Sequence, residues 1–286
     1  MSNRSSRQEV AKETISIIAK KAYDFEGNSV NLYGDLDYSS KLYVEEELDV
    51  LCKNSELNKR NFKTKLKFKK ESVVSTIITC GKSPKEYGKV TVLTFASARH
   101  AGGGFLKGSM AQEEAIAYAS DLHPRIKNFP DFYKYSKHFK SGIYSHRMIY
   151  TKNLVVFRDA NGDLLKAPVN CDVISSCAVN ITDLKRKNQY DLISIANEVM
   201  TERIERVIAL AKDNHTDTLI LGAFGTGVFG NNPYRIKEAF QTILNKPEYR
   251  TAFKFVIFAV TDSLRGSTDV YSIFSDIKLS KISEWN

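Results

Sequence analysis

The sequence predicts an α/β fold, in which helices cover both faces of a central sheet. The expected strands are continuous apolar runs, such as residues 88–98 and 217–224, rather than the alternating pattern of a half-exposed sheet. Helical segments separate these runs along the chain, which is the order typical of an α/β domain. With 286 residues, 42% hydrophobic and 26% charged, the chain is long enough for one large domain or a domain with an extension.

The N-terminal part of the chain differs from the rest. Residues 1–70 are expected to form a mostly helical extension packed on a core of residues 71–286. Within the extension, the apolar spacing predicts helices at residues 5–23 and 39–54. Residues 63–80 are expected to form strands, because lysines first alternate with apolar residues and a β-branched run follows.

The remaining elements follow in order along the core. An Asn-Gly turn predicts a β-hairpin within residues 142–165. The longest amphipathic helix is expected at residues 193–214, just before the strand at 217–224. The other expected elements are a strand at 171–180, a helix at 234–244, a strand at 253–260 and a short helix at 268–277.

Charge is unevenly distributed along the chain, whose formal net charge is +9 at pH 7. Residues 53–70 contain eight bases and one acid, and residues 125–152 contain seven bases and one acid. Such stretches attract polyanions, including nucleic acids. Lysines along an edge strand, which block unwanted pairing with another strand, also explain the first stretch. Charge alone does not decide between these explanations.

Several classes of protein are not indicated. No run of about 18 apolar residues occurs, so we expect no membrane-spanning helix, and the N-terminus lacks the apolar core of a secretory signal. The cysteines have no CxxC spacing, and the histidines are not clustered, so neither a zinc site nor a disulfide framework is expected. We therefore expect a cytoplasmic protein with no metal, no cofactor and reduced cysteines, which are Cys52, Cys80, Cys171 and Cys177.

Two glycine loops follow two of the buried strands, at residues 102–104 and 225–230. In open α/β sheets, ligands bind beyond the carboxyl ends of strands. We expect both loops to direct backbone N–H groups outward and to form anion-binding nests. Neither loop has the Lys-Ser/Thr ending of a P-loop. Asn232 and Pro233 look like the cap and first residue of a later helix, which weakens the match to a dinucleotide-binding loop.

A Gln-Glu-Glu triplet follows the first glycine loop. Ser109 and Gln112 have the spacing of a capping box, and acids favour a first helical turn, so Gln112 and Glu113 can be explained as structural residues. Glu114 lies beyond this box. Neighbouring helix residues point about 100° apart, so Glu113 and Glu114 are not expected to flank a bond from opposite sides. If chemistry occurs here, one glutamate is the acid/base and the other holds the substrate.

The stretch GGGFLKGSMAQEE, in which seven residues separate three glycines from Gln-Glu-Glu, resembles the poly(ADP-ribose) glycohydrolases, which are built on a macrodomain. Further stretches follow the order of the microbial type of that family, among them VLTFASARHAGGG, LVVFRDANGDLL, CDVISSCAVN and LILGAFGTGVFGNNP. The resemblance implies a macrodomain-like three-layer fold, with a mixed central sheet flanked by helices. It also implies a metal-independent glycosidase whose partner is ADP-ribose or poly(ADP-ribose) on a modified macromolecule.

The resemblance also implies roles for individual residues. Glu114 would be the general acid that protonates the leaving oxygen of a ribose–ribose bond and then activates water, while Glu113 would hydrogen-bond the ribose hydroxyls. Such a double role needs a carboxyl pKa raised toward neutrality. The implied substrate-binding residues are the ribose-wrapping Gly102, Gly103 and Gly104, then Gln112 and His100, and a diphosphate cradle of Gly225, Thr226, Gly227, Val228 and Phe229.

The chain departs from the microbial pattern at several positions. Thr94 replaces an Asn, His100 and Ala101 replace Asn-Pro, and Tyr118 replaces an Arg; residues 224–226 replace Trp-Gly-Cys. These changes leave two other functions open. One is hydrolysis of ADP-ribose from nucleic acid or from an acyl ester, and the other is ADP-ribose binding without catalysis.

Overall fold

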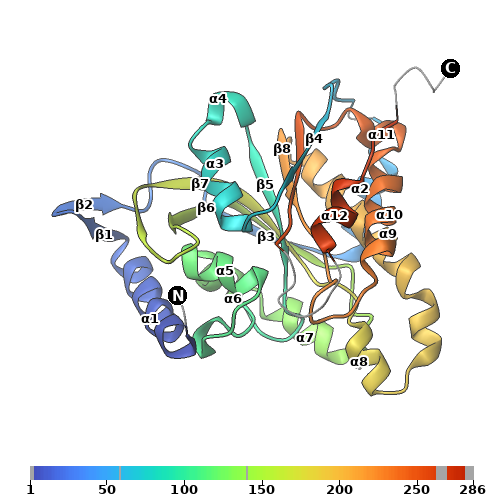
Figure 1. The fold of residues 1–286 in the computed structure, drawn as a ribbon, viewed down its shortest axis with the longest axis horizontal. Helices are drawn as coiled ribbons and strands as arrows, with labels where there is room; N and C mark the ends of the chain where they lie inside the picture. The colour runs from blue at the N-terminus through green and yellow to red at the C-terminus, as the bar shows by residue number, and fades with distance from the viewer. Residues whose placement is uncertain (1–2, 58, 140, 262–268, 281–286) are drawn as a thin grey trace.

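A seven-stranded mixed sheet forms the centre of the computed structural model, which describes residues 3–57, 59–139, 141–261 and 269–280 (Figure 1). Its five neighbouring strands from β7 to β4 are parallel, whereas β6 is antiparallel to β3 and β7. The order across the sheet is β3 (Ser40–Tyr43), β6 (Met148–Arg158), β7 (Leu164–Ser176), β5 (Val90–Phe95), β8 (Thr218–Leu221), β9 (Phe255–Ala259) and β4 (Lys65–Lys69).

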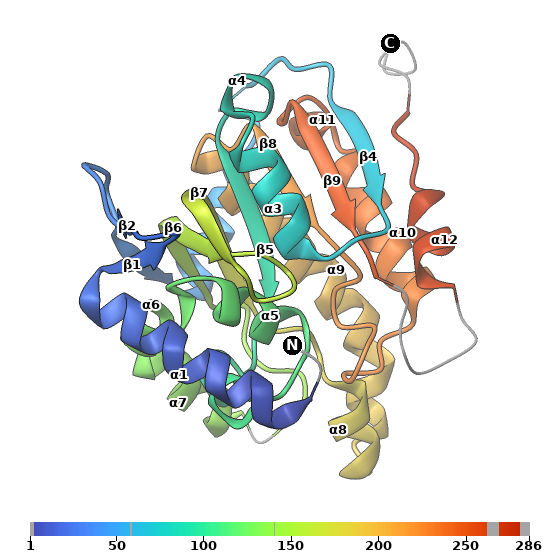
Figure 2. The same cartoon turned by 60° about the vertical axis from the view of Figure 1, so that its left-hand side comes forward.

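Helices cover both faces of this sheet (Figure 2). Successive residues of β5 point to opposite faces, so Val92 packs in one apolar cluster and Leu93 in the other. The Val92 side is covered by α3 (Val73–Gly81) and α5 (Gln112–Ala119), and the Leu93 side by α2 (Glu45–Lys53), α9 (Tyr190–Asp213), α10 (Pro233–Leu244) and α12 (Val270–Ser275). This confirms the predicted three-layer α/β arrangement.

The other helices are shorter or lie outside the two main layers. None of the helices in the described part of the chain combines the length and apolar character that crossing a membrane requires. The helices not yet named are α1 (Arg4–Lys20), α4 (Pro84–Tyr87), the 3-10 helix η1 (Phe105–Lys107), α6 (Leu122–Lys127), α7 (Pro130–His138), α8 (Ile181–Arg186) and α11 (Pro247–Arg250).

The first 70 residues contain strands as well as α1 and α2. The helix predicted at residues 39–54 is wrong in its first part, because Ser40–Tyr43 is the strand β3 and α2 begins at Glu45. After α1, a two-stranded hairpin forms from β1 (Ala22–Phe25) and β2 (Asn28–Asn31). β3 and β4 then supply the two edges of the main sheet. The division of the chain at residue 70 remains a prediction. The main sheet contains strands from both sides of that residue.

The lysine-rich strand β4 is an edge strand, since among the described strands it pairs only with β9. Its Lys67 ammonium lies 4.1 Å from the centroid of the Phe255 ring and 3.1 Å from a Glu86 carboxylate oxygen. Charged residues on such an edge prevent pairing with another chain. The position of β4 therefore favours the edge-strand explanation for this basic stretch.

The expected strand at residues 71–80 is wrong, because Val73–Gly81 is the helix α3. The Ser72 side chain caps this helix by accepting a hydrogen bond from the Ser75 N–H. Its buried residues Val73, Thr76, Ile77 and Cys80 are spaced three and four apart, which is the period of a helix facing a sheet. The run of β-branched residues concealed this period.

The predicted hairpin and the later elements are confirmed, except that the strand expected at residues 171–180 is not separate, because residues 171–176 are the end of β7. β6 and β7 form the hairpin, and its turn is closed by a hydrogen bond from the Gly162 N–H to the Asp159 carbonyl. The longest helix is α9. Asn232 caps α10 by accepting the Tyr234 N–H, with Pro233 as its first residue, as predicted.

The helical assignment of α3 can be tested at its exposed residue Thr79. We expect Thr79→Ala to raise the free energy of unfolding by up to about 0.7 kcal/mol, because Ala has the higher helix propensity. Urea denaturation would measure this change. A decrease would instead fit a strand, where Thr is preferred. Ile77→Ala, at the buried face, should lower the same free energy by about 2–5 kcal/mol.

Candidate active site

The two glycine loops lie side by side, because they leave the carboxyl ends of the neighbouring parallel strands β5 and β8. The rings of Phe95 and Phe224, at the starts of the two loops, have centroids 5.3 Å apart. A Cβ at Gly222 would lie only 3.1 Å from the Phe95 ring. The predicted placement of both loops at one edge of the sheet is therefore confirmed.

Gln112, the first residue of α5, is hydrogen-bonded to strand β5. Its Oε1 accepts the Phe95 N–H at 2.9 Å, and its Nε2 donates to the Leu93 carbonyl at 2.8 Å. The capping box with Ser109 is wrong, since Ala111 is the N-cap residue and the Gln112 side chain points to the strand. Its substrate-binding role remains a prediction.

The Glu113 carboxylate is buried beneath the first glycine loop and accepts two backbone N–H groups. One comes from Ser97 at 2.8 Å and the other from Gly102 at 3.1 Å. Burial raises the pKa of the Glu113 carboxyl to about 8; the two N–H groups oppose this rise, and the charge of Glu114 adds to it. The carboxyl whose pKa is raised is thus Glu113, to which the resemblance assigns the ribose hydroxyls rather than the proton transfer.

Glu114 is held at one oxygen only. Its Oε1 accepts the Gly104 N–H at 2.9 Å, and the side chain is largely buried. Its Oε2 makes no hydrogen bond to any described residue. This oxygen is therefore the one that a ligand can engage.

Both carboxylates converge on Gly103. A Cβ at this position would lie 2.4 Å from a Glu114 oxygen and 3.1 Å from a Glu113 oxygen. Gly103 also has a φ of 57°, in the left-handed region that side chains disfavour. Close approach and backbone conformation both require glycine here.

The first loop is not the anion nest that we expected, because its N–H groups bind the protein itself. Gly102 and Gly104 donate to the two glutamates, and the Gly103 N–H donates to the His100 carbonyl at 3.0 Å. The buried carboxylates have taken the place of an external anion. A ligand at this loop can therefore contact the glycine backbone and the Glu114 carboxylate.

The second loop keeps its N–H groups available. Those of Gly225, Gly227, Val228 and Phe229 make no hydrogen bond within the described chain, while the Thr226 N–H donates to the Ala223 carbonyl. No described heavy atom beyond the chain neighbours lies within 4 Å of a Cβ built on Gly227. Unpaired amides beside open space are what an anion-binding nest needs.

Two contacts that the sequence did not predict support the second loop. The Asn231 Nδ2 donates to the carbonyls of Val179 at 2.7 Å and Gly225 at 2.9 Å. The buried Tyr144, whose φ is 53°, places its ring centroid 6.3 Å from that of Phe229. Neither contact has a local sequence signal, because each depends on tertiary packing.

A buried arginine fixes the segment that carries Tyr144. The Arg203 guanidinium in α9 donates to the carbonyls of Cys177 at 2.8 Å and Ile143 at 3.0 Å. Its charge is thus compensated by backbone dipoles, which a helix pattern cannot predict.

Two of the departures from the family pattern lie in the interior. Thr94 and Tyr118 are fully buried, and the Tyr118 hydroxyl lies 2.9 Å from the Phe105 carbonyl and 2.8 Å from the Ser109 carbonyl, either of which can accept its proton. Tyr118 thus supports the turn that joins the first glycine loop to α5. His100 is exposed, just before that loop, and its ligand-binding role remains a prediction.

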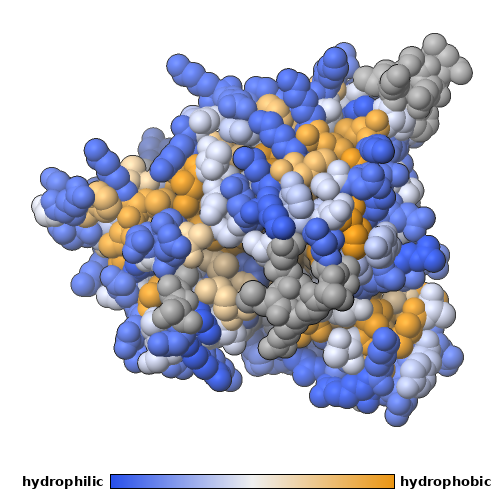
Figure 3. All heavy atoms as spheres, in the orientation of Figure 1, coloured by the Kyte–Doolittle hydropathy of each residue, from blue (hydrophilic) through white to orange (hydrophobic). Residues whose placement is uncertain are grey.

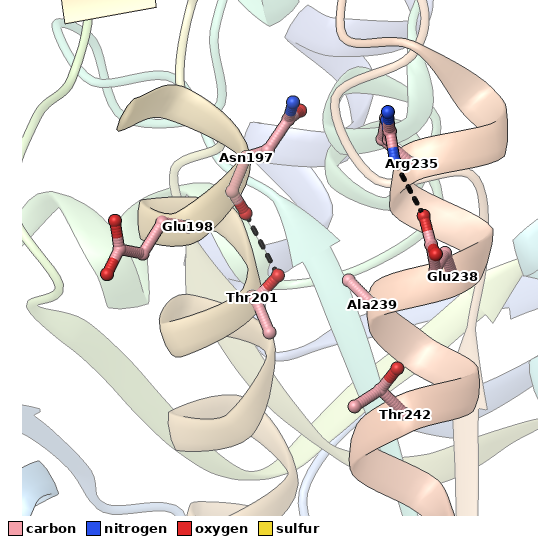
Figure 4. A pocket seen from close by; sticks show the side chains of 7 residues that line it. All are labelled: Asn197, Glu198, Thr201, Arg235, Glu238, Ala239 and Thr242. Atoms are coloured by element: carbon pink, nitrogen blue, oxygen red, sulfur yellow. Dashed lines mark hydrogen bonds and ion pairs between the residues drawn. The ribbon is translucent and has the colours of Figure 1, made fainter. Parts of the chain in front are cut away.

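Other candidate sites are separate from the loops. Within the described residues, no group of three or more His, Cys, Asp and Glu side chains could hold a metal ion. A groove of about 310 Å³ lies between α9 and α10 and includes Arg235 and Glu238 (Figure 4). A second hollow, of about 370 Å³, lies beside α1 and β1. Neither includes a residue of the two glycine loops.

Residues 11–159 match the model of the microbial-type poly(ADP-ribose) glycohydrolase catalytic domain. This segment contains the first glycine loop and both glutamates. The chain belongs to this family. No curated protein sequence matches it significantly.

Solved structures of glycohydrolases extend the similarity over almost the whole chain. The poly(ADP-ribose) glycohydrolase of Thermomonospora curvata bound to the inhibitor ADP-HPD is 30% identical, with a TM-score of 0.82, over 94% of this chain and 98% of that one. The Deinococcus radiodurans enzyme in complex with ADP-ribose is 27% identical, with a TM-score of 0.74, over 82% of this chain and 92% of that one.

The buried carboxyl of Glu113 predicts a pH-dependent stability for this glycohydrolase family member. A folded pKa of about 8, above the ordinary 4.5, means that the folded state binds the proton more tightly than the unfolded state. The resulting stabilisation is complete below about pH 4.5 and is lost as the pH rises through about 8. Each tenfold difference in proton affinity between the two states corresponds to about 1.4 kcal/mol.

We expect Glu113→Gln to show a smaller loss of unfolding free energy between pH 5 and pH 9 than the wild type. Urea unfolding at several pH values measures the slope. Glu238→Gln, at an exposed carboxylate, is the control and should keep the wild-type slope. Equal slopes in all three proteins would contradict the raised pKa.

Proposed function

We propose that this chain hydrolyses the ribose–ribose O-glycosidic bond of poly(ADP-ribose) and releases ADP-ribose, with Glu114 as the general acid and base. The observation that carries the proposal is the Glu114 carboxylate, whose Oε1 is fixed by the Gly104 N–H while its Oε2 is left to a ligand. The family membership and the ADP-ribose and ADP-HPD complexes of the relatives support ADP-ribose as the bound group.

The two loops have different tasks in this proposal. The free amides of Gly225, Gly227, Val228 and Phe229 bind the diphosphate, where a fixed dipole array suits two negative charges. The backbone of residues 102–104 lies against the distal ribose. This places the anomeric carbon near Glu114, and Phe229 packs beside the sugar.

Glu114 is the carboxyl placed to act as the acid. Its Oε1 accepts the Gly104 N–H, and its Oε2 makes no hydrogen bond within the described chain. Both Glu113 oxygens accept backbone N–H groups, so Glu114 is the one with an oxygen left for the substrate. A proton on that oxygen passes to the leaving oxygen as the glycosidic bond breaks.

Hydrolysis is completed by the same carboxylate. Departure of the leaving sugar gives an oxocarbenium-like ribose, and the ionised Glu114 then takes a proton from the attacking water. Glu113 stays buried and holds the loop and the ribose hydroxyls. No step requires a metal ion or a cofactor.

The N-terminal extension has a supporting role in this proposal. From α1, the Arg4 Nε donates to the Lys107 carbonyl at 2.8 Å and the Arg7 Nε to the Gly108 carbonyl at 2.9 Å. The extension therefore holds the turn between the first glycine loop and Glu114. The protein is proposed to act in the cytoplasm, where its basic stretch at residues 125–152 attracts the polyanionic substrate or a nucleic acid that carries it.

The decisive variant is Glu114→Gln, which keeps the side-chain shape and removes the acid. We expect ADP-ribose release from automodified poly(ADP-ribose) polymerase, without added metal, to fall by about 10²- to 10⁴-fold. Chromatography of released ADP-ribose measures this loss. Binding of ADP-ribose, followed by calorimetry, should remain.

The control is Glu238→Gln, which removes an exposed carboxylate from α10 and should leave turnover unchanged. ADP-ribose binding without release by the wild type would contradict the polymer substrate. The same assay with ADP-ribosylated nucleic acid or acyl-ADP-ribose would then separate another bond from a purely binding role.

A further inference from the structure

A group of three cations surrounds one buried carboxylate at the rim of the two loops. The Asp183 carboxylate lies 2.8 Å from the Lys187 ammonium and 3.9 Å from the Arg99 guanidinium, and it also pairs with Arg186. Asp183 is only 5% exposed, whereas the side chains of Arg99 and Arg186 are 51% and 68% exposed. Two arginines that reach solvent therefore share one carboxylate, which also pairs with Lys187.

This cluster connects the two glycine loops. Arg99 lies between Ser97 and Gly102, whose N–H groups both bind Glu113. On the other side, Asp183 follows Thr182, whose backbone N–H donates to the Phe229 carbonyl and whose hydroxyl donates to the Val228 carbonyl. The cluster thus lies beside the edge where the ribose-binding and diphosphate-binding loops meet.

Arg99 and Arg186 can pair with an anion in addition to Asp183. Among the described residues, Asp183 is the only carboxylate that pairs with Arg99 or Arg186. Figure 3 shows a hydrophilic surface over α8, which carries Arg186. A guanidinium offers two parallel N–H donors that match phosphate oxygens, and an exposed one retains them for a ligand.

We propose that Arg99 and Arg186 bind the diphosphate of the ADP-ribose unit on the far side of the bond that is cleaved. This inference rests on the proposed function. In poly(ADP-ribose) every unit carries a diphosphate, and cleavage at Glu114 separates two units. The first diphosphate occupies the amides of the second loop, so the departing unit needs a second cationic site next to the first loop.

The site would favour chains over single ADP-ribose groups. Its contacts are made by exposed charges, so they act mainly on binding of the polymer and weaken with salt. Neither arginine is among the residues assigned above to the bound ADP-ribose or to proton transfer. Chain binding and chemistry are therefore separable.

The test replaces both arginines by Gln, with Arg235→Gln as the control for loss of an exposed positive charge. Arg235 is 59% exposed and lies in the groove between α9 and α10, apart from both loops (Figure 4). Steady-state kinetics are measured on long poly(ADP-ribose) and on ADP-ribose joined to a small uncharged leaving group. Calorimetry gives the affinity for ADP-ribose.

We expect the double variant to raise KM for the polymer about tenfold, which corresponds to about 1.4 kcal/mol of binding. The kcat for the polymer, the kinetic parameters for the uncharged substrate and the affinity for ADP-ribose should not change. The effect should shrink at high salt, and Arg235→Gln should behave like the wild type. An unchanged polymer KM would overturn the proposal. So would an equal loss on the uncharged substrate or in ADP-ribose affinity, which would assign the cluster a structural role.

A binding experiment separates this inference from the proposed function. In the Glu114→Gln background, the polymer should bind more tightly than ADP-ribose, and the double arginine replacement should remove that excess. This result would support the second site even if the wild type released no ADP-ribose. Absence of the excess before replacement would overturn the second site, whatever the wild-type activity.

Discussion

The site depends on hydrogen bonds between the side chains that open α5 and the backbone that leaves β5. Gln112 binds the end of the strand, Glu113 binds Ser97 and Gly102, and Glu114 binds Gly104. A buried loop must satisfy its N–H groups, and these three side chains do so from one helical turn. The geometry of the Glu114 carboxylate is therefore a consequence of how the loop is hydrogen-bonded.

This pairing explains why glycines alone do not make an anion site. Both loops contain glycine at positive φ, including Gly103 and Gly225. In the first loop the N–H groups of Gly102 and Gly104 donate to the protein's own carboxylates, whereas in the second loop those of Gly225, Gly227, Val228 and Phe229 make no hydrogen bond within the described chain. Two glycine-containing loops thus present opposite surfaces, one with a carboxylate and one with N–H donors. A diphosphate sugar needs both along its length.

The sequence predicted the α/β class, most elements and the site segments, because apolar runs and glycine loops report on local constraints. It failed at α3, where β-branched residues concealed a helical period that only the sheet contact of Ile77 makes evident. The predicted capping box of Ser109 and Gln112 was also wrong. Tertiary packing decides whether the Gln112 side chain caps the helix or binds the strand, and here it binds the strand. Arg203 and Tyr144 gave no signal, because their partners are distant backbone groups.

The same logic accounts for the departures at Thr94 and Tyr118. Their side chains lie in the interior, where Tyr118 supports the turn before α5 through two backbone carbonyls. In the proposed reaction, most ligand-facing groups are backbone amides, and a backbone amide is unchanged when a side chain differs. The constraint on sequence then falls on Gly103, where the carboxylates approach, and on Glu114, which supplies the proton. In the proposed reaction, substitutions elsewhere in the loops change the residues that position Gly103 and Glu114, and not the group that transfers the proton.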